Sequence, residues 1–546
     1  MQGLMSSFPL TLPHVFHRAE RMFGDKRIVT ATAQGRERVS YAEWAERTRR
    51  LAGALDDLGL AADARVATFA WNTARHLELY FAAPCTGRVL HTLNIRLFPE
   101  QLRYIVDHAE DEVIFADRSL VRLLEPHLDG FHTVRHLVVM DDGSGELPDD
   151  DRIVDYEELI GRAQPAEFGD GDEQRAAAMC YTSGTTGNPK GVVYSHRSTV
   201  LHSVGTMLAD SLGVCERDVV LPVVPMFHAN AWGLGQAGVM AGADFVLPGA
   251  DLSPRAIADL MESEHVTLAA GVPTIWLWML DELDGRDFSA LTRIVCGGSA
   301  VPRSLSEAYR ERLGMPILQA WGMTETSPLG SIARVRSTLD GRPEEELADY
   351  RASQGVVSPL VEIRIADPDG EELPWDGQAS GELQARGPWV AAAYYDDDRS
   401  AESFTADGWL RTGDVATISP EGYIRLVDRT KDVVKSGGEW ISSVELENQI
   451  MAHPKVREAA VIGLPDERWG ERPVACVVPE AGAELDGDEV RDFLEGRVAR
   501  WWIPERVEFI EEVPKTSVGK FSKKTLRERF APGEGAPDAT APSSAG

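Results

Sequence analysis

The first part of the chain alternates between helical and extended hydrophobic patterns. Leucines recur at Leu51, Leu55 and Leu58, which places them on one face of a helix. An apolar run over 65–70 follows as a strand, and a second such pair is helical over 102–106 and extended over 112–116. Helices that alternate with strands are typical of parallel sheets covered by helices. We therefore expect layered α/β structure in this part of the chain.

Two further apolar runs, 176–181 and 192–194, flank a stretch of small and polar residues, YTSGTTGNPKG at 181–191. We expect a loop between two strands. Its glycines let backbone N–H groups approach an anion, its hydroxyls can donate to phosphoryl oxygens, and its lysine supplies a charge. The common P-loop is excluded, because glycine follows Lys190 and Pro189 precedes it.

A phosphate-holding loop is the interpretation that this chemistry favours, and the alternative is a plain turn, which needs neither the hydroxyls nor the lysine. The residues assigned to phosphate binding are Thr182, Ser183, Gly184, Thr185, Thr186, Gly187 and Lys190.

Composition limits the number of domains, the partners and the location. The 546 residues are too many for one ordinary core, so at least two domains are expected. With 55 basic and 87 acidic side chains the net charge is −32, which argues against nucleic acid or anionic lipid as a general partner. Five dispersed cysteines suit reduced thiols in the cytoplasm. No signal peptide or integral membrane segment is expected, since no apolar run reaches about 18 residues.

The 181–191 stretch closely resembles the signature of the adenylate-forming enzymes, the superfamily of acyl-CoA synthetases, non-ribosomal adenylation domains and luciferases. The remaining signatures follow in the expected order: GMTET at 322–326, TGD at 412–414, DRTKD at 428–432 and PKTSVGK at 514–520. The resemblance extends from around Phe8 to around Phe530.

An α/β fold is implied by this resemblance: a large N-terminal domain of layered α/β sheets plus a β-barrel-like subdomain, and a small mobile α+β C-terminal domain. It implies an N-terminal AMP-binding domain at 1–427, a hinge at 428–432, with Lys431 as the favoured pivot, and a C-terminal domain at 433–530. The tail at 531–546 is mostly Ala, Pro, Gly, Ser and Asp, and we expect it to be disordered.

The adenine pocket is assigned by resemblance to two segments. The first carries Gly298, Ser299 and Ala300, and the second carries Trp321 and Gly322. Trp321 stands where relatives usually have tyrosine, and it offers a larger ring for the same stacking contact.

The phosphates, the metal and the ribose are assigned in the same way. Thr324 corresponds to the residue that binds the α-phosphate, and Glu325 corresponds to the ligand of Mg²⁺, which prefers carboxylate and phosphate oxygens. Asp414 has two oxygens for the two ribose hydroxyls, and Arg429 would reach the same ribose.

The acid site is expected around His228. A histidine beside apolar residues is more often a core group, but the resemblance favours a residue that positions the acid, since a carboxylate ionised at pH 7 needs no base. Trp232, Gly233 and Gly235 would lie along the acyl channel, with the glycines leaving space. Trp440, in a GGEWIS run typical of fatty acyl-CoA synthetases, would gate the fatty-acid tunnel or, alternatively, fill the core.

The coenzyme A step is assigned to the C-terminal part. Gly437 and Gly438 would let the pantetheine pass close to the backbone, with Lys435 serving thioester formation. Lys520 corresponds to the adenylation lysine and precedes a helix expected to start near Ser522. The other basic residues of this end are expected to lie on a solvated helix face: Lys515, Lys523, Lys524, Arg527 and Arg529.

The expected reaction is activation of a fatty acid by ATP to acyl-AMP, with release of pyrophosphate, and transfer to coenzyme A. Alternatives are a 3-methylthiopropionyl-CoA ligase of the same family, an adenylation enzyme that loads a carrier protein, a luciferase-like oxidoreductase and a nucleotide sensor without catalysis. The sensor is disfavoured because Lys520 and Glu325 are both present. Residues 8–30 resemble the start of dimeric relatives, so we expect a homodimer. The chain length of the acid stays open.

Overall fold

The computed structural model describes residues 1–182, 188–436, 439–466, 468–515 and 521–531. The chain divides into two compact units. The first comprises Met1–Ala379, Leu383–Thr412 and Thr417–Arg425, and the second comprises Ser380–Glu382, Gly413–Ala416 and the chain from Leu426 onward. The long segment of the second unit thus begins beside the expected hinge at 428–432, and the hinge itself stays a prediction.

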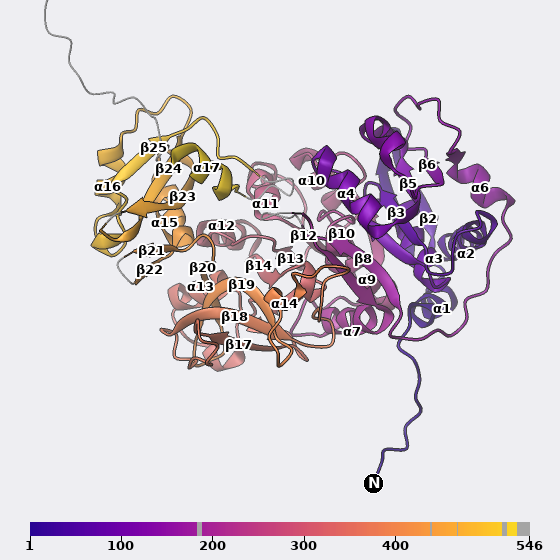
Figure 1. Cartoon of the computed structure of the whole chain (residues 1–546), viewed down its shortest axis with the longest axis horizontal. Helices are drawn as coiled ribbons and strands as arrows, with labels where there is room; N and C mark the ends of the chain where they lie inside the picture. The colour runs from indigo at the N-terminus through magenta and orange to yellow at the C-terminus, as the bar shows by residue number, and fades with distance from the viewer. Residues whose placement is uncertain (183–187, 437–438, 467, 516–520, 532–546) are drawn as a thin grey trace, which may run out of the picture. The chain divides into compact units, whose positions relative to one another are not determined.

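A seven-stranded sheet occupies the N-terminal part of the first unit, drawn in the indigo and purple colours of Figure 1. Its neighbouring strands are parallel except at one edge, where β8 and β9 are antiparallel. In sheet order the strands are β7 (Ile153–Asp155), β6 (His136–Met140), β5 (Asp111–Asp117), β3 (Arg65–Phe69), β4 (Val89–Thr92), β8 (Ala176–Tyr181) and β9 (Gly191–Ser195). The expected strands around the 181–191 stretch are therefore confirmed.

A second sheet of nine strands completes the α/β layers of this unit. Its middle strands pair in parallel, and the pairs β14–β15, β15–β16 and β1–β2 are antiparallel. In order they are β16 (Val356–Val357), β15 (Leu329–Ile332), β14 (Leu318–Gly322), β13 (Arg293–Cys296), β12 (Leu268–Gly271), β10 (Val219–Pro222), β11 (Asp244–Leu247), β1 (Arg27–Thr32) and β2 (Gly35–Ser40).

Helices connect these strands, as the alternating pattern predicts. They are α1 (Leu12–Met22), α2 (Tyr41–Asp57), α3 (Ala74–Cys85), α4 (Pro99–Ala109), α5 (Arg118–Leu124), α6 (Tyr156–Arg162), α7 (His196–Met207), α8 (Ala229–Trp232), α9 (Leu234–Ala241), α10 (Pro254–Ser263), α11 (Pro273–Met279), α12 (Arg303–Leu313), α13 (Glu344–Ala352) and α14 (Ser400–Ser403).

Helix α2 shows how the sequence sets a helix and its buried face. Ser40 and Glu43 form a reciprocal capping box, since the backbone N–H of each donates to the side chain of the other. Leu51 and Leu55 are fully buried in the largest core cluster, and Leu58 packs against its edge. The predicted apolar face is confirmed.

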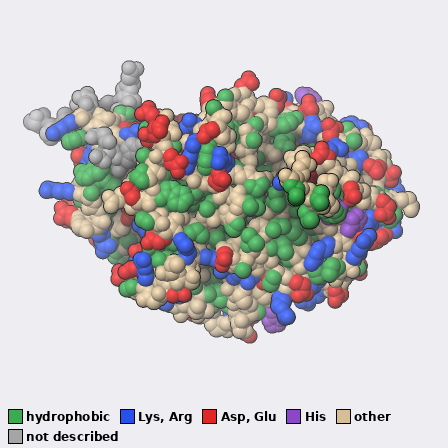
Figure 2. Space-filling model, turned by 90° about the horizontal axis from the view of Figure 1, so that it is seen from below, with side chains coloured by type: hydrophobic (Ala, Val, Ile, Leu, Met, Phe, Trp, Pro, Cys, Tyr) green, Lys and Arg blue, Asp and Glu red, His purple; other side chains and the backbone are tan. Residues whose placement is uncertain are grey.

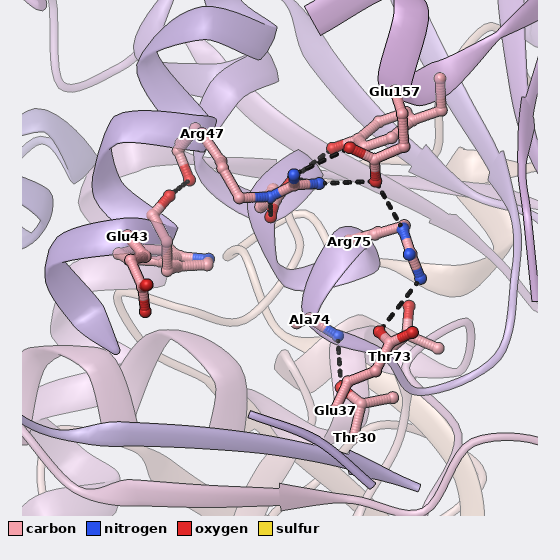
Figure 3. Close-up of polar contacts among 12 residues, drawn as sticks. Thr30, Glu37, Glu43, Arg47, Thr73, Ala74, Arg75 and Glu157 are labelled. Atoms are coloured by element: carbon pink, nitrogen blue, oxygen red, sulfur yellow. Dashed lines mark hydrogen bonds and ion pairs between the residues drawn. The ribbon is translucent and has the colours of Figure 1, made fainter. Parts of the chain in front are cut away.

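Helices α2, α3 and α6 are also joined by ion pairs (Figure 3). Arg47 donates from Nε to Oε1 of Glu78 at 2.6 Å and from Nη1 to Oε2 of Glu157 at 2.8 Å. Arg75 donates to Glu157 at 3.0 Å and pairs with Glu37 of β2 at 3.5 Å. Because Glu78 is buried, burial raises the pKa of its carboxyl, and Arg47 is the charge that offsets this effect.

A four-stranded sheet stands where the sequence led us to expect a barrel-like subdomain. Its strands, in order, are β17 (Glu362–Ala366), β18 (Ser380–Arg386), β19 (Leu410–Ile418) and β20 (Ile424–Arg429).

In the described residues of the second unit lie a five-stranded sheet and three α-helices, drawn in yellow in Figure 1. The elements are β21 (Val434–Ser436), β22 (Glu439–Ile441), α15 (Ser443–Met451), β23 (Val456–Asp466), β24 (Gly470–Pro479), α16 (Gly487–Leu494), β25 (Arg506–Phe509) and α17 (Lys523–Phe530). Helix α17 begins beside Ser522, as predicted.

The surface drawn in Figure 2 mixes acidic and basic side chains, with apolar side chains exposed among them. Neither sign of charge is gathered into one patch on this face. In the described part of the chain, no helix is both long enough and apolar enough to cross a bilayer.

Candidate functional site

The ends of the predicted phosphate loop are held together by two hydrogen bonds. The backbone N–H of Thr182 donates to the carbonyl of Lys190 at 2.9 Å, and the N–H of Lys190 donates to the Thr182 hydroxyl at 3.1 Å. The hydroxyl of Tyr181, the residue before Thr182, lies 2.7 Å from Nδ1 of His108. Ser183, Gly184, Thr185, Thr186 and Gly187 lie outside the described residues. Their role in phosphate binding stays a prediction.

The side chain of Lys190 is directed to two groups of the segment that precedes and includes α14. Its ammonium lies 4.3 Å from the ring centre of Tyr394 and donates to the hydroxyl of Ser403 at 3.1 Å. A lysine placed over an aromatic face is attracted by the negative face of the ring. The geometry therefore holds the Lys190 charge near the ends of the loop.

Glu325 lies in a short 3-10 helix, Thr324–Thr326, and is only 5% exposed. Its Oε1 accepts a hydrogen bond from the hydroxyl of Tyr394 at 2.6 Å, and the carbonyl of Thr324 accepts one from Tyr194 at 2.8 Å. Tyr394 was not expected from the sequence, and it joins the predicted metal ligand to the predicted phosphate lysine.

The donor set suits a magnesium ion that arrives with a nucleotide. Among the described residues there is no group of three or more His, Cys, Asp or Glu side chains able to hold a metal. Mg²⁺ is commonly held by one or two carboxylates together with substrate phosphates. A single buried carboxylate, Glu325, beside a phosphate loop fits that mode of binding.

The predicted adenine walls follow strands β13 and β14. The backbone N–H of Val301, just after Ala300, donates to the side chain of Gln319 at 3.0 Å and ties the two walls together. Trp321 is 7% exposed, and a Cβ added at Gly330 would lie 2.4 Å from its ring. Gly322 is required by packing, because a Cβ there would lie 1.7 Å from the carbonyl oxygen of Pro328. Gly298 and Ser299 lie in the same segment between Cys296 and Val301.

The segment after His228 has a conformation that the sequence did not predict. The four residues of α8 all have positive φ: 42° at Ala229, 52° at Asn230, 50° at Ala231 and 57° at Trp232. This is a left-handed helical turn built without glycine, and L-residues adopt that region at a cost. His228 is the residue immediately before the turn.

Buried hydrogen bonds hold the turn. The side-chain oxygen of Asn230 accepts from the hydroxyl of Thr92 and from the thiol of Cys180, each at 3.2 Å. Cys180 is the penultimate residue of β8, which leads into the phosphate loop. The turn after His228 and the strand that leads into the predicted phosphate loop therefore share a buried contact.

The glycines after the turn serve packing rather than leave space. A Cβ at Gly233 would lie 2.5 Å from the ring of His202, and one at Gly235 would lie 3.2 Å from the ring of Tyr80. Protein side chains therefore already occupy the space that the two glycines leave. The expectation that these glycines open the acyl channel is wrong at these two positions.

Asp414 and Arg429, assigned to the ribose, are paired in the second unit. Nε of Arg429 lies 2.9 Å from Oδ1 of Asp414, which is 5% exposed. The N–H of Thr430 donates to the carbonyl of Gly413 at 2.9 Å, so the backbone joins the same two segments.

Lys435 is an exposed residue of β21. In the antiparallel register of β21 and β22, its backbone lies opposite that of Trp440. Gly437, Gly438 and Lys520 lie outside the described residues. The roles assigned to Lys435, Gly437, Gly438, Trp440 and Lys520 stay predictions. The same holds for the ribose contacts of Asp414 and Arg429.

Comparisons with known proteins identify the family of the chain. Residues 16–395 match the AMP-binding enzyme family, and residues 445–520 match the AMP-binding enzyme C-terminal domain. A long-chain-fatty-acid–CoA ligase of Thermus thermophilus is 46% identical, over 96% of this chain and 98% of that protein. A 3-methylmercaptopropionyl-CoA ligase of Ruegeria pomeroyi is 45% identical, over 97% and 99%.

The fold matches that of a solved relative. The crystal structure of ATP-bound MatB from Rhodopseudomonas palustris has a TM-score of 0.81 and 28% identity, and the match covers 95% of this chain and 99% of that one. The expected α/β fold and the expected class of AMP-forming acid–thiol ligase are confirmed. By sequence over nearly its whole length and by fold, the chain belongs to the AMP-binding enzyme family.

Proposed function

We propose that this protein activates a fatty acid with ATP and transfers the acyl group to coenzyme A. The observation that carries the proposal is the meeting of Lys190 and Glu325 on Tyr394, beside the closed ends of the 181–191 loop. This arrangement offers a cation for phosphate and a buried carboxylate for a metal within one polar site.

In the first step a carboxylate oxygen of the acid attacks the α-phosphorus of ATP. The bond from that phosphorus to the bridging oxygen breaks, and pyrophosphate leaves with the electron pair. Thr324 binds the α-phosphate, the loop and Lys190 hold the outgoing phosphates, and His228 positions the acid. Glu325 would hold Mg²⁺, which supplies charge neutralisation to the phosphates when bound. Lys520 serves this step by reaching the attacking and leaving oxygens.

In the second step the sulfur of coenzyme A attacks the acyl carbonyl, and AMP leaves. A thiol with a pKa near 8.5 is only a few per cent ionised at neutral pH, so its delivery must be precise. Lys435 and the Gly437–Gly438 pair would serve this delivery, and Asp414 and Arg429 would keep hold of the ribose.

A short thioether acid is the second candidate substrate. It is favoured by the 45% identity to the relative named 3-methylmercaptopropionyl-CoA ligase, which is close to the 46% of the long-chain ligase. Chain length therefore has to be measured.

The test is a screen of pyrophosphate release over short, medium and long acids and 3-methylthiopropionate, each with and without coenzyme A. Acyl-CoA and AMP should form in equal amounts with at least one acid. Glu325→Gln should abolish release, whereas Glu311→Gln, a change at an exposed residue, should leave it intact. Formation of ADP, or acyl-AMP that is never passed to coenzyme A, would contradict the proposal.

We also propose a cytoplasmic homodimer that associates through its N-terminal region. All five cysteines are free thiols, which supports a reducing compartment. Met1, Leu4, Met5 and Phe8 are exposed apolar residues, which supports an interface near this end. Light scattering at micromolar concentration should give a dimer mass, and deletion of residues 1–8 should lower it towards that of the monomer. A monomer mass for the full chain would contradict the dimer.

A further inference from the structure

One segment of the first unit contacts both halves of the proposed phosphate site. It runs from Ala391 to Ser403, between β18 and the end of α14. The N–H of Ala391 donates to the carbonyl of Glu325 at 2.7 Å, and the N–H of Tyr395 donates to the carbonyl of Gly191 at 2.8 Å. The backbone of this segment is therefore fastened to the glutamate on one side and to the end of the loop on the other.

Side chains of the same segment repeat this connection. The Tyr394 hydroxyl donates to Oε1 of Glu325 at 2.6 Å, while the face of its ring lies 4.3 Å from the Lys190 ammonium. Ser403 accepts a hydrogen bond from that ammonium at 3.1 Å. One tyrosine thus contacts the anion with its hydroxyl and the cation with its ring.

Tyr394 is itself rigidly placed. It is 9% exposed, its backbone N–H donates to the hydroxyl of Ser400 at 2.9 Å, and its ring packs against Phe404 with centroids 5.6 Å apart. The phenol occupies only Oε1 of Glu325. The other oxygen, Oε2, accepts no hydrogen bond from any described residue, so it is left for a cation.

We propose that Tyr394 is a positioning residue that fixes the Glu325 carboxylate for magnesium and the Lys190 ammonium for phosphate, so that both reach one Mg²⁺–ATP. The inference rests on the proposed function for the identity of that ligand. The inference goes beyond the proposed function because it assigns to Tyr394 the spacing between the metal ligand, Glu325, and the phosphate lysine, Lys190.

The two contacts of Tyr394 can be separated by substitution. Tyr394→Phe keeps the ring over Lys190 and removes the hydroxyl from Glu325, whereas Ser403→Ala keeps the Tyr394 hydroxyl and removes the group that accepts from Lys190. Tyr309→Phe is the matched control, because Tyr309 is also buried and also loses one hydroxyl bond, to the carbonyl of Trp276 at 2.8 Å.

Two binding measurements on the purified full chain give the readout. One is the affinity for ATP in EDTA, measured by calorimetry, and the other is the affinity of the enzyme–ATP complex for Mn²⁺, measured by EPR. Tyr394→Phe should weaken Mn²⁺ binding about tenfold, as expected for one hydrogen bond to a charged group, with ATP affinity in EDTA unchanged. Ser403→Ala should weaken ATP binding severalfold and leave Mn²⁺ binding unchanged.

The control should change neither affinity. If Tyr394→Phe leaves Mn²⁺ binding unchanged, or weakens both affinities equally, Tyr394 is a packing residue and the inference is wrong. The proposed function fails by a different result, the absence of pyrophosphate release with every acid by the wild-type protein, and the binding measurements judge Tyr394 in either case.

Discussion

The left-handed turn at Ala229–Trp232 should cancel the usual cost of replacing alanine by glycine. Ala231 has φ 50° and ψ 40° and is 1% exposed, whereas Ala54 of α2 is fully buried in a right-handed helix. The change at Ala54 should destabilise the protein clearly, and the same change at Ala231 should have almost no effect on stability.

The magnitudes follow from three contributions. Either change removes a buried methyl, worth about 0.8 kcal/mol. In α2 glycine costs about 1 kcal/mol more than alanine, so Ala54→Gly should destabilise by about 2 kcal/mol in total. At Ala231 glycine relieves about 1–2 kcal/mol of left-handed strain. This gain offsets two costs, the lost burial of the methyl group and the greater conformational entropy of the unfolded chain, which is about 0.5–1 kcal/mol.

Thermal unfolding of both variants beside the wild type, at one scan rate, measures the difference. About 2 kcal/mol corresponds to roughly 2 °C in Tm for a chain of this size. Strained backbone gathers at functional sites, so Ala231→Gly should also raise the KM for the acid severalfold, because a relaxed turn holds His228 less firmly. Equal losses of Tm in the two variants would show that the turn is unstrained in solution and would refute the reasoning.

Three further predictions concern the second unit. Lys520→Ala should slow acyl-AMP formation by about 10²- to 10³-fold, yet the variant should still convert supplied acyl-AMP and coenzyme A to product. Lys435→Ala should show the reverse pattern. If either change slows both half-reactions equally, the two lysines do not serve separate steps. Trp440→Ala should change the KM differently for acids of different length, and an unchanged series would make Trp440 a core residue. Burial raises the pKa of Glu447 to about 6, so its contribution to stability is complete below about pH 4.5 and is lost as pH rises through 6. The stability advantage of wild type over Glu447→Gln should therefore be larger at pH 5 than at pH 7, by roughly 1 kcal/mol, and a constant difference would contradict the shift.

The elements that the sequence predicted are those whose signals are local. The strands around the 181–191 stretch and the buried face of α2 follow from periodicity within one window, which is where such patterns are informative. The helix near Ser522 was expected instead from the family resemblance around Lys520.

Tyr394 and the left-handed turn could not be predicted in that way. The contacts of Tyr394 reach residues 69 and 204 positions away, and nothing in the run AAAYYDDD around it indicates phosphate chemistry. The turn contains one asparagine, the residue type that visits left-handed conformations, but two alanines and a tryptophan that do so rarely. Tertiary contacts, such as those of Thr92 and Cys180 with Asn230, impose it.

The basic C-terminal run shows why charge alone does not predict exposure. Lys523 was expected on a solvated face, yet it is 8% exposed and its ammonium pairs with the buried Glu447 at 2.7 Å. A lysine is buried only where partners compensate its charge, and these partners come from α15 and the hinge segment, distant in sequence. The carboxylate of Asp428 accepts from the N–H of Ser443 at 2.6 Å, and its charge, like that of Glu447, raises the pKa of Lys523. Arg527 of the same helix pairs with Asp432 at 2.6 Å, so both ends of the predicted hinge contact helices of the second unit, and a rotation within 428–432 would require one of these contacts to break.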